Sequence, residues 1–409
     1  MLNETYSILQ RVGSSSDVLM RSLSGLDELE IASSGSVVKG HKGGEYLDFG
    51  SFALFLFGHS PELFVRSLTD QLSRFSGSSR TLLNQIHAEA LEALLSLDPT
   101  KTLSKGLLLN TGSEACEAAL KLASLKTGRR HFLHMRHSFH GKTLGALGVT
   151  DGLLYRSLSY GTDFSQALTG ADPEQDCRKI LESRPAAVIC EPVQGEGGVR
   201  ELTDGYLREI RKACSQAGSL LIFDEIQCGL GRTGHLWACQ KSGQVPDILL
   251  CGKALGAGII PVSAMLATKE AFAPLDKNPL IHTSTYAANP LACRAVLTAV
   301  DCVNSGVPEA CFTKGILFKT ILDDLVFRYP SVFSERRGRG LMQGLKCKSS
   351  EISGRFLKAC LNRKILVTPC LSSPDVVRLS PPSVVTEKEL RQAFDIFDCA
   401  AHSVEQSSK

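Results

Sequence analysis

The sequence predicts an α/β fold built around a mostly parallel sheet. Short apolar runs recur through the middle of the chain, and segments with helical spacing separate them. With 409 residues, the chain is long enough for about two or three structural units and a large packed core. Ligands of such sheets usually bind beyond the carboxyl ends of the strands, so we expect the functional site there.

The predicted elements alternate along the chain. Four apolar runs that end in polar or glycine residues are expected to be strands buried on both faces, at 106–110, 186–192, 219–225 and 247–253. Two crossover helices are expected, because residues 113–126 repeat Ala and Leu at helical spacing and residues 204–217 begin with an acid and stop at Gly218. Near the C-terminus, a helix-like stretch at 312–327 precedes glycine-rich and proline-rich segments, which indicates a smaller second domain.

Composition and charge exclude several classes of function. The 45 Lys and Arg residues against 42 Asp and Glu give a net charge of +3 and are scattered, so nucleic acid is not an expected partner. The apolar runs are shorter than the roughly 20 residues that cross a bilayer, so no membrane partner is expected. The N-terminus lacks the pattern of a secretory signal, which favours a cytoplasmic location. None of the 14 cysteines forms a C-x-x-C pair, so neither a disulfide framework nor a zinc site is predicted.

Three weaker motifs favour no site of their own. The segment 229–234, GLGRTG, matches the dinucleotide pattern G-x-G-x-x-G, but neither a convincing crossover helix nor an acid about twenty residues on follows it. The G-K-T at 141–143 lacks the first glycine of a phosphate-binding P-loop, because Arg136 stands there. Four histidines recur every three residues but lack companion metal ligands, so we predict no metal site and expect them at the surface or the rim of an active site: His131, His134, His137 and His140.

Residues that could bind a cofactor or react with it lie at the ends of three predicted strands. Gly112 and Ser113 begin a helix, where free N–H groups and the helix dipole suit a phosphate monoester, although Ser113 could equally be an ordinary N-cap. Asp224 ends an apolar strand and needs a cationic or donor partner there, which a structural salt bridge would also supply. Lys253 precedes a glycine-rich turn, where burial can lower its pKa enough for a nucleophile and proton shuttle, although such a lysine can also be a cap or surface cation. Together these residues offer the three contacts that pyridoxal phosphate needs.

A family resemblance covers nearly the whole chain. Six segments, 110–121, 138–150, 191–199, 223–234, 251–258 and 282–292, occur in the order and spacing of class III pyridoxal-phosphate aminotransferases, the group with ornithine, acetylornithine and putrescine aminotransferases. The chain is thereby identified as a member of that family. The resemblance implies the fold type I architecture: a large domain at 49–300 with a mostly parallel seven-stranded sheet, and a smaller α+β domain formed by 1–48 and 301–409.

The resemblance also implies roles for individual residues. Lys253 resembles the Schiff-base lysine, which carries the substrate α-proton to the cofactor C4′ carbon, and Asp224 resembles the carboxylate that keeps the pyridine nitrogen protonated. Thr285 resembles the threonine that reaches across a dimer interface to the phosphate, which implies a homodimer with shared active sites. The other implied cofactor contacts are Gly112 and Ser113 at the phosphate, Phe139 stacked on the ring, Gln227 at the ring hydroxyl, Glu191 supporting this polar layer, and His140.

Substrate clues come from the same resemblance. Arg378 matches the arginine that holds a substrate carboxylate, and Glu196 the acid that pairs with it when that carboxylate is absent, so glutamate and 2-oxoglutarate are implied as one substrate pair. Lys142 stands where ornithine-type enzymes carry an arginine for the α-carboxylate, and lysine is a poorer bidentate partner. The Phe-rich segment 50–59 is one residue shorter than in those relatives, which predicts a less polar pocket, unless this run is core packing.

Segments 140–148 and 278–293 are most similar to the putrescine-type branch. A pyridoxal-phosphate-dependent aminotransferase that moves an amino group between a terminal amine and 2-oxoglutarate by a ping-pong cycle is therefore predicted. The alternatives are an acetylornithine or ornithine-type enzyme, an aminomutase or racemase of the same fold, and a non-catalytic protein that keeps the fold. Intact Lys253 and Asp224 argue against the last.

Overall fold

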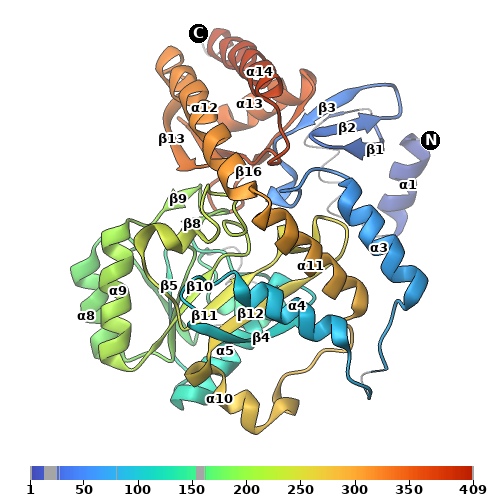
Figure 1. Ribbon diagram of the computed structural model, residues 1–409. Helices are drawn as coiled ribbons and strands as arrows, with labels where there is room; N and C mark the ends of the chain where they lie inside the picture. The colour runs from blue at the N-terminus through green and yellow to red at the C-terminus, as the bar shows by residue number, and fades with distance from the viewer. Residues whose placement is uncertain are drawn as a thin grey trace.

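The computed structural model describes residues 2–12, 25–26, 28–79, 81–152, 161 and 163–407 (Figure 1). Its central element is a seven-stranded sheet with the order β4-β12-β11-β10-β7-β5-β6. In that order, the strands are Leu103–Leu109, Ser263–Thr268, Ile248–Cys251, Leu220–Asp224, Ala187–Cys190, Phe132–Met135 and Ser165–Leu168. β12 is antiparallel to both of its neighbours, and the other pairs are parallel, so the predicted mostly parallel α/β sheet is confirmed.

The middle strands are buried on both faces, as their apolar runs predicted. Alternate residues of β10 face two different cores: Leu221 and Phe223 pack with the side chains of α9 (Asp204–Ala217), and Ile222 packs with those of α5 (Gly112–Thr127). The strand predicted at 106–110 is present as part of β4, which ends at Leu109, but its expected burial on both faces was wrong. β4 is an edge strand, its neighbour in the described sheet is antiparallel, and Gly106 and Leu107 are half-buried.

The two predicted crossover helices are present, with one corrected start. α9 begins after the cap Thr203 and ends at Gly218, whose φ of 62° lies in the left-handed region that favours glycine. α5 begins one residue earlier than predicted, because its N-cap is Thr111 and not Ser113. The Thr111 hydroxyl accepts from the Glu114 N–H, and the Glu114 carboxylate accepts from the Thr111 N–H, which together form a capping box.

Further helices cover the sheet (Figure 1). α8 (Pro173–Ser183) packs beside α9, and α10 (Lys269–Lys277) beside α5. α11 (Pro290–Asn304) packs against α3 (Glu62–Arg74) and α4 (Gln85–Ser96). The remaining short elements of this part are α6 (Leu144–Gly148), β8 (Val193–Gln194), β9 (Arg200–Glu201) and 3-10 helices at Ser51–Ala53, Ala238–Ser242, Lys253–Gly256 and Pro279–Ile281.

The C-terminal part forms a second α+β unit, drawn in orange and red in Figure 1. An antiparallel sheet with the order β13-β14-β17-β16 contains Phe333–Arg339, Met342–Cys347, Val376–Leu379 and Thr368–Pro369. Its helices are α12 (Val307–Arg328), α13 (Ser350–Asn362) and α14 (Glu387–Gln406). α12 is longer than the predicted stretch 312–327 at both ends.

The N-terminal segment joins this second unit. β1 (Glu30–Ser34), β2 (Val37–Gly40) and β3 (Glu45–Asp48) form an antiparallel ribbon, and β3 pairs in parallel with β15 (Ile365–Leu366). The Phe49 ring contacts Phe318 and Phe397 edge-on, at centroid distances of 5.7 and 6.1 Å. Residue 300 lies inside α11, and the division into 49–300 and 1–48 with 301–409 stays a prediction. α1 (Leu2–Val12) precedes the ribbon.

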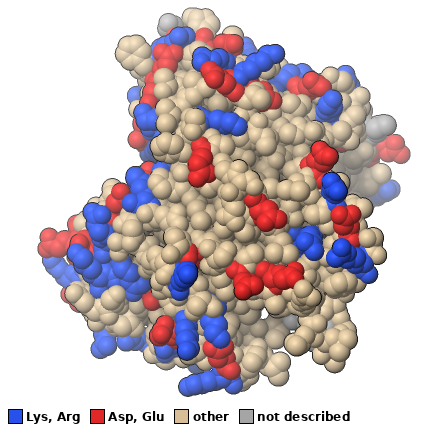
Figure 2. All heavy atoms as spheres, in the orientation of Figure 1, with Lys and Arg blue, Asp and Glu red and all other residues tan. Residues whose placement is uncertain are grey.

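The surface carries mixed charge. On the face shown in Figure 2, Lys and Arg side chains are interspersed with Asp and Glu. None of the helices that the structure describes is long and apolar enough to span a bilayer.

Candidate active site

A pocket of about 200 Å³ lies at the carboxyl ends of the parallel strands. Its walls come from the residues that follow β4, β5, β7, β10 and β11, which is where the sequence predicted the site. Nine of the predicted site residues line it: Gly112, Ser113, Phe139, His140, Glu191, Glu196, Asp224, Gln227 and Lys253. Three others, Thr285, Lys142 and Arg378, lie outside this set.

The first turn of α5 forms one end of the pocket. Thr111, Gly112 and Ser113 lie there, and the first N–H groups of a helix have no partners within the helix. The space is tight. A Cβ on Gly112 would lie 2.9 Å from Cδ1 of Ile226, and a Cβ on Gly141 would lie 2.2 Å from Oγ of Ser113. This turn therefore offers backbone donors and a positive helix end in a space that an added side chain would fill.

Asp224 finds its partner in a histidine. Oδ2 of Asp224 lies 2.7 Å from Nδ1 of His140, and Oδ1 accepts from the Ile226 N–H at 3.0 Å. Both side chains are buried, and Nε2 of His140 has no hydrogen-bond partner among the described residues. The expected need for a donor partner is thus met by His140, and His140 belongs to the pocket. His134, by contrast, is buried in β5, so its expected place at a surface or rim was wrong.

Lys253 lines the same pocket. It opens the 3-10 helix after β11, and its φ of 46° is unusual for a residue with a side chain. Burial lowers the pKa of Lys253 from 10.5 to about 8, although the nearby Glu196 carboxylate opposes that shift. A substantial fraction of the amine is therefore neutral near pH 8, which is the form that acts as a nucleophile or a base.

Glu191 and Gln227 organise the polar wall between these groups. Glu191 accepts from the N–H groups of Phe139 at 3.0 Å and Gly195 at 3.1 Å, which fixes the segment that carries Phe139. Burial raises the pKa of Glu191 to about 7. Nε2 of Gln227 donates to the Phe52 carbonyl and to Oε1 of Glu196, both at 3.4 Å, whereas its buried Oε1 has no partner in the described part of the chain.

A buried ion pair joins the pocket to the second unit. Arg378 on β17 contacts Oε1 of Glu196 through a guanidinium nitrogen, and both side chains are almost fully buried. Oε2 of Glu196 accepts from the Leu371 N–H at 3.1 Å. Although burial alone would raise it, Arg378 and Lys253 hold the pKa of Glu196 below its usual value. The predicted pairing of Arg378 with Glu196 is thus present, next to Lys253.

Sequence reasoning missed two residues at this end of the pocket. The Phe52 ring lies over Arg378, with 5.7 Å from its centroid to Cζ, in a turn where Ser51, Phe52 and Ala53 have φ of 42°, 52° and 61°. The buried Arg232 of the GLGRTG segment donates to the carbonyls of Ala53 at 3.4 Å, Leu341 at 3.4 Å and Pro381. Neither role has a local sequence signal, because each contact joins residues more than a hundred positions apart.

Thr285 and Lys142 lie outside the pocket. Thr285 lines a separate hollow of about 930 Å³ together with Asn110, Ile260 and the strongly exposed Leu83 and Tyr286. Lys142 is exposed, and its backbone N–H donates to Oγ of Ser113 at 3.4 Å. Contact of Thr285 with a partner's phosphate and contact of Lys142 with substrate stay predictions.

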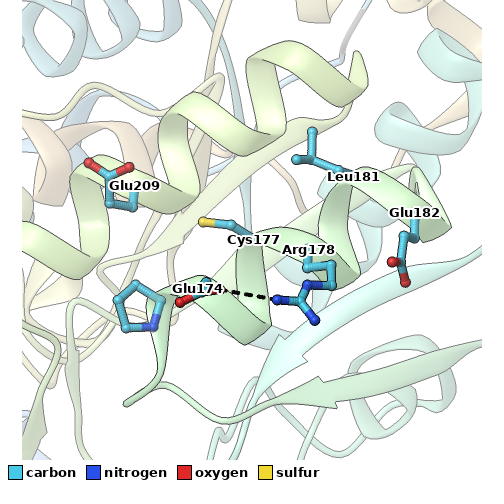
Figure 3. Close-up of a pocket in the computed structure, with 7 residues that line it drawn as sticks. Glu174, Cys177, Arg178, Leu181, Glu182 and Glu209 are labelled. Carbon is cyan, nitrogen blue, oxygen red and sulfur yellow. Dashed lines mark hydrogen bonds and ion pairs between the residues drawn. The ribbon is translucent and has the colours of Figure 1, made fainter.

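Size alone does not locate the site. A groove of about 690 Å³ between α8 and α9 is larger than the pocket around Lys253 (Figure 3). Its labelled residues include Cys177 and Glu209, and Arg178 pairs with Glu174 at 3.1 Å. None of the predicted site residues lines this groove.

The residues around Lys253 fit pyridoxal phosphate. The first turn of α5 suits its phosphate, Asp224 its pyridine nitrogen and Lys253 its aldehyde. Nε2 of His140 and Oε1 of Gln227 are buried polar atoms without partners in the described chain, and such atoms point to a bound polar group.

Comparisons with known proteins agree with this geometry. Residues 30–400 match the family model of class III aminotransferases. A putrescine aminotransferase of Pectobacterium atrosepticum is 36% identical over 371 residues, which cover 87% of this chain and 79% of that protein. The structure of ornithine aminotransferase from Toxoplasma gondii has a TM-score of 0.87 at 28% identity and covers 93% of this chain and 92% of its own. An amine transaminase from an uncultivated Pseudomonas species, solved with PLP bound, has a TM-score of 0.85 at 25% identity, over 93% and 95% of the two chains.

Proposed function

The chain belongs to the class III family of pyridoxal-phosphate-dependent aminotransferases, and from that premise we propose that it moves an amino group between a terminal amine and 2-oxoglutarate. The observation that carries the proposal is the buried pair of Arg378 and Glu196 beside Lys253. Glu196 can neutralise Arg378 when a substrate lacks a carboxylate there, and it can leave Arg378 when a substrate carboxylate binds. This arrangement suits an enzyme whose two substrates differ in one carboxylate. A diamine or aminoaldehyde is the proposed second partner, because it lacks that group.

Two residues, Asp224 and Lys253, would carry the chemistry, and Gly112 and Ser113 would hold the cofactor. When bound, pyridoxal phosphate supplies a charged ring that stabilises negative charge at the substrate carbon. Asp224, held by His140 at 2.7 Å, presents its carboxylate to the pyridine nitrogen and keeps that nitrogen protonated. Nζ of Lys253 accepts the proton from the substrate carbon, since a pKa of about 8 leaves part of the amine neutral. Gly112 and Ser113 hold the phosphate.

Neighbouring residues position these groups. Glu191 fixes the backbone of Phe139, whose ring would stack on the cofactor, and Gln227 lies beside Glu196 for the ring hydroxyl. In the amine half-reaction, Glu196 neutralises Arg378. In the 2-oxoglutarate half-reaction, the distal carboxylate of the substrate takes the place of Glu196 on the guanidinium, and the fork of Arg378 allows bidentate contact.

Part of the Phe-rich segment supports an apolar amine site. Leu54 borders a hollow of about 290 Å³ with Ile259, Ile260 and Pro261, and this hollow shares Lys253 with the catalytic pocket. Other members of the same segment, Leu56 and Phe57, are core residues. The segment thus contains core residues, and the side of it that borders this hollow would suit the methylene chain of a diamine.

The test is an absorbance spectrum of the PLP-loaded protein during single additions of glutamate, putrescine, ornithine and acetylornithine. We expect glutamate and putrescine each to convert the cofactor to its amine form. Conversion by ornithine or acetylornithine but not by putrescine would favour the ornithine-type alternative, which the similarity to the Toxoplasma enzyme supports. No conversion by glutamate would contradict the role of Arg378 and favour a mutase.

The proposal includes a homodimer with shared active sites and a cytoplasmic location. Thr285 would reach the phosphate in the partner subunit from a hollow whose exposed Leu82, Leu83 and Tyr286 suit burial against a second copy. Gel filtration of the loaded enzyme, with Thr285→Ala as the variant, tests this. A fully active monomer would contradict it.

A further inference from the structure

The Glu114 carboxylate caps α5 and also contacts a residue outside the helix, Ser284. Oε2 accepts from the backbone N–H groups of Asn110 at 2.7 Å and Thr111 at 3.2 Å, which completes the cap of α5. Oε1 accepts from Oγ of Ser284 at 3.4 Å, and Nδ2 of Asn110 donates to both oxygens, at 3.0 Å to Oε2 and 3.3 Å to Oε1. Asn110 also donates from Nδ2 to Oγ of Ser284 at 2.9 Å. The contact between Oε1 and Ser284 is therefore one that the cap does not need.

These contacts join two segments that are far apart in sequence. One is the turn 110–113 at the start of α5, and the other is the segment that precedes α11 and contains Ser284 and Thr285. Nζ of Lys121, two turns further along α5, donates to the Ile281 carbonyl at 3.3 Å, so the second segment is fastened to the helix at two places. Asn110 and Thr285 line the same hollow.

We propose that Glu114 is a positioning residue that sets the turn 110–113 and the Thr285 segment at a fixed distance from each other. The inference rests on the proposed function, in which Gly112 and Ser113 hold the phosphate of one subunit and Thr285 holds that of the partner. Because Ser284 directly precedes Thr285, its bonds to Asn110 and Glu114 restrict where Thr285 can lie. Glu114 would thus support two phosphate sites at once.

The direction of the change in phosphate affinity distinguishes a positioning role of Glu114 from a purely electrostatic one. A carboxylate near a phosphate repels it, so removal of the charge alone would tighten phosphate binding. Loss of a positioning contact would weaken binding. Glu114→Gln keeps one carbonyl oxygen for the cap, since Gln is accepted at this position of a capping box, but it places an NH₂ group where the second acceptor stood.

The experiment measures equilibrium binding of pyridoxal 5′-phosphate and of pyridoxal to the cofactor-free protein by fluorescence. The dissociation constant of pyridoxal divided by that of pyridoxal 5′-phosphate measures how much the phosphate contacts contribute to binding. This ratio does not depend on turnover. For Glu114→Gln we expect this ratio to fall about tenfold, as for the loss of one charge-assisted hydrogen bond. Ser284→Ala, which changes neither charge nor cap, should give a similar fall, and the double variant should lose little more than either single one.

Glu117→Gln is the matched control, since it removes the same charge from the same helix but bonds to Gly145 and Ala146 instead. We expect its ratio to stay equal or to rise. Unchanged ratios in both Glu114→Gln and Ser284→Ala, with wild type still preferring the phosphorylated form, would overturn the inference. If Glu114→Gln fails to fold, Ser284→Ala alone decides. Failure of wild-type protein to bind pyridoxal phosphate would instead contradict the proposed function.

Discussion

Replacement of Lys253 by methionine should stabilise the cofactor-free protein while it abolishes turnover. Burial lowers the pKa of Lys253 from 10.5 to about 8, so folding disfavours the charged amine. At about 1.4 kcal/mol per pKa unit, this shift corresponds to at most about 3 kcal/mol, because part of the residue still contacts solvent. Methionine has a similar length and no charge, and it relieves that cost.

The pH dependence follows from the direction of the shift. Between the folded pKa of about 8 and the ordinary value of 10.5, the unfolded chain binds more protons than the folded one, so wild-type stability rises with pH across this window. The advantage of Lys253→Met is therefore complete below pH 8 and disappears towards pH 10.5. It should not depend on pH below 8.

Urea unfolding of both proteins at several pH values, after removal of the cofactor, measures this difference. Lys358→Met is the matched control, because Lys358 is exposed on α13. We expect no comparable gain there. A Lys253→Met variant that is less stable than wild type at pH 7, or a gain that persists unchanged above pH 10.5, would refute the reasoning.

Four further substitutions test the remaining assignments. Asp224→Asn should retain the cofactor but slow proton removal from glutamate by roughly 100-fold in single-turnover spectra, and an unchanged rate would make Asp224 purely structural. Arg378→Lys should raise KM for 2-oxoglutarate about tenfold and leave the half-reaction with the amine almost unaffected. Phe52→Ala uncovers Arg378, so kcat/KM should rise for 2-oxoglutarate and fall for an apolar amine; equal changes for both would mean that the ring only packs. Glu191→Gln should remove the loss of stability that the wild type shows as pH rises from 4.5 to 7, because that loss comes from a carboxyl pKa raised to about 7; a variant whose melting temperature falls as much as that of wild type between pH 5 and 8 would contradict this.

The fold was predictable where one segment carries its own signal. The runs at 219–225 and 247–253 are apolar on both faces, and such runs belong in the middle of a parallel sheet. The apolar run at 106–110 looked the same but lies in an edge strand, because neighbour order is a property of the whole sheet. The parallel pairing of β3 with β15 joins residues more than 300 positions apart, and neither strand contains a sign of it.

The residues at the proposed cofactor end of the pocket were predictable for the same reason. Asp224 ends a strand and Lys253 and Gly112 follow strands, and the carboxyl ends of parallel strands meet at one edge of a sheet. The start of α5 also had a local signal that was misread: Thr111 and Glu114 form the T-x-x-E pattern of a capping box, which places the cap at Thr111. Nothing in the residues around Phe52 indicates that its ring lies over Arg378.

The two ends of the pocket differ in how they are built. The cofactor end stands on strand ends of one sheet, whereas the substrate end depends on a turn at Ser51–Ala53 whose three left-handed residues cost about 1–2 kcal/mol each. Arg232 helps to hold that turn, since it donates to the Ala53 carbonyl as well as to Leu341 and Pro381 of the second unit. Burial lowers the pKa of Arg232 to about 10, and within the described chain its acceptors are all backbone carbonyls. A change in the packing of the second unit should therefore alter the position of Phe52 over Arg378, and with it the choice of substrate, before it alters cofactor binding.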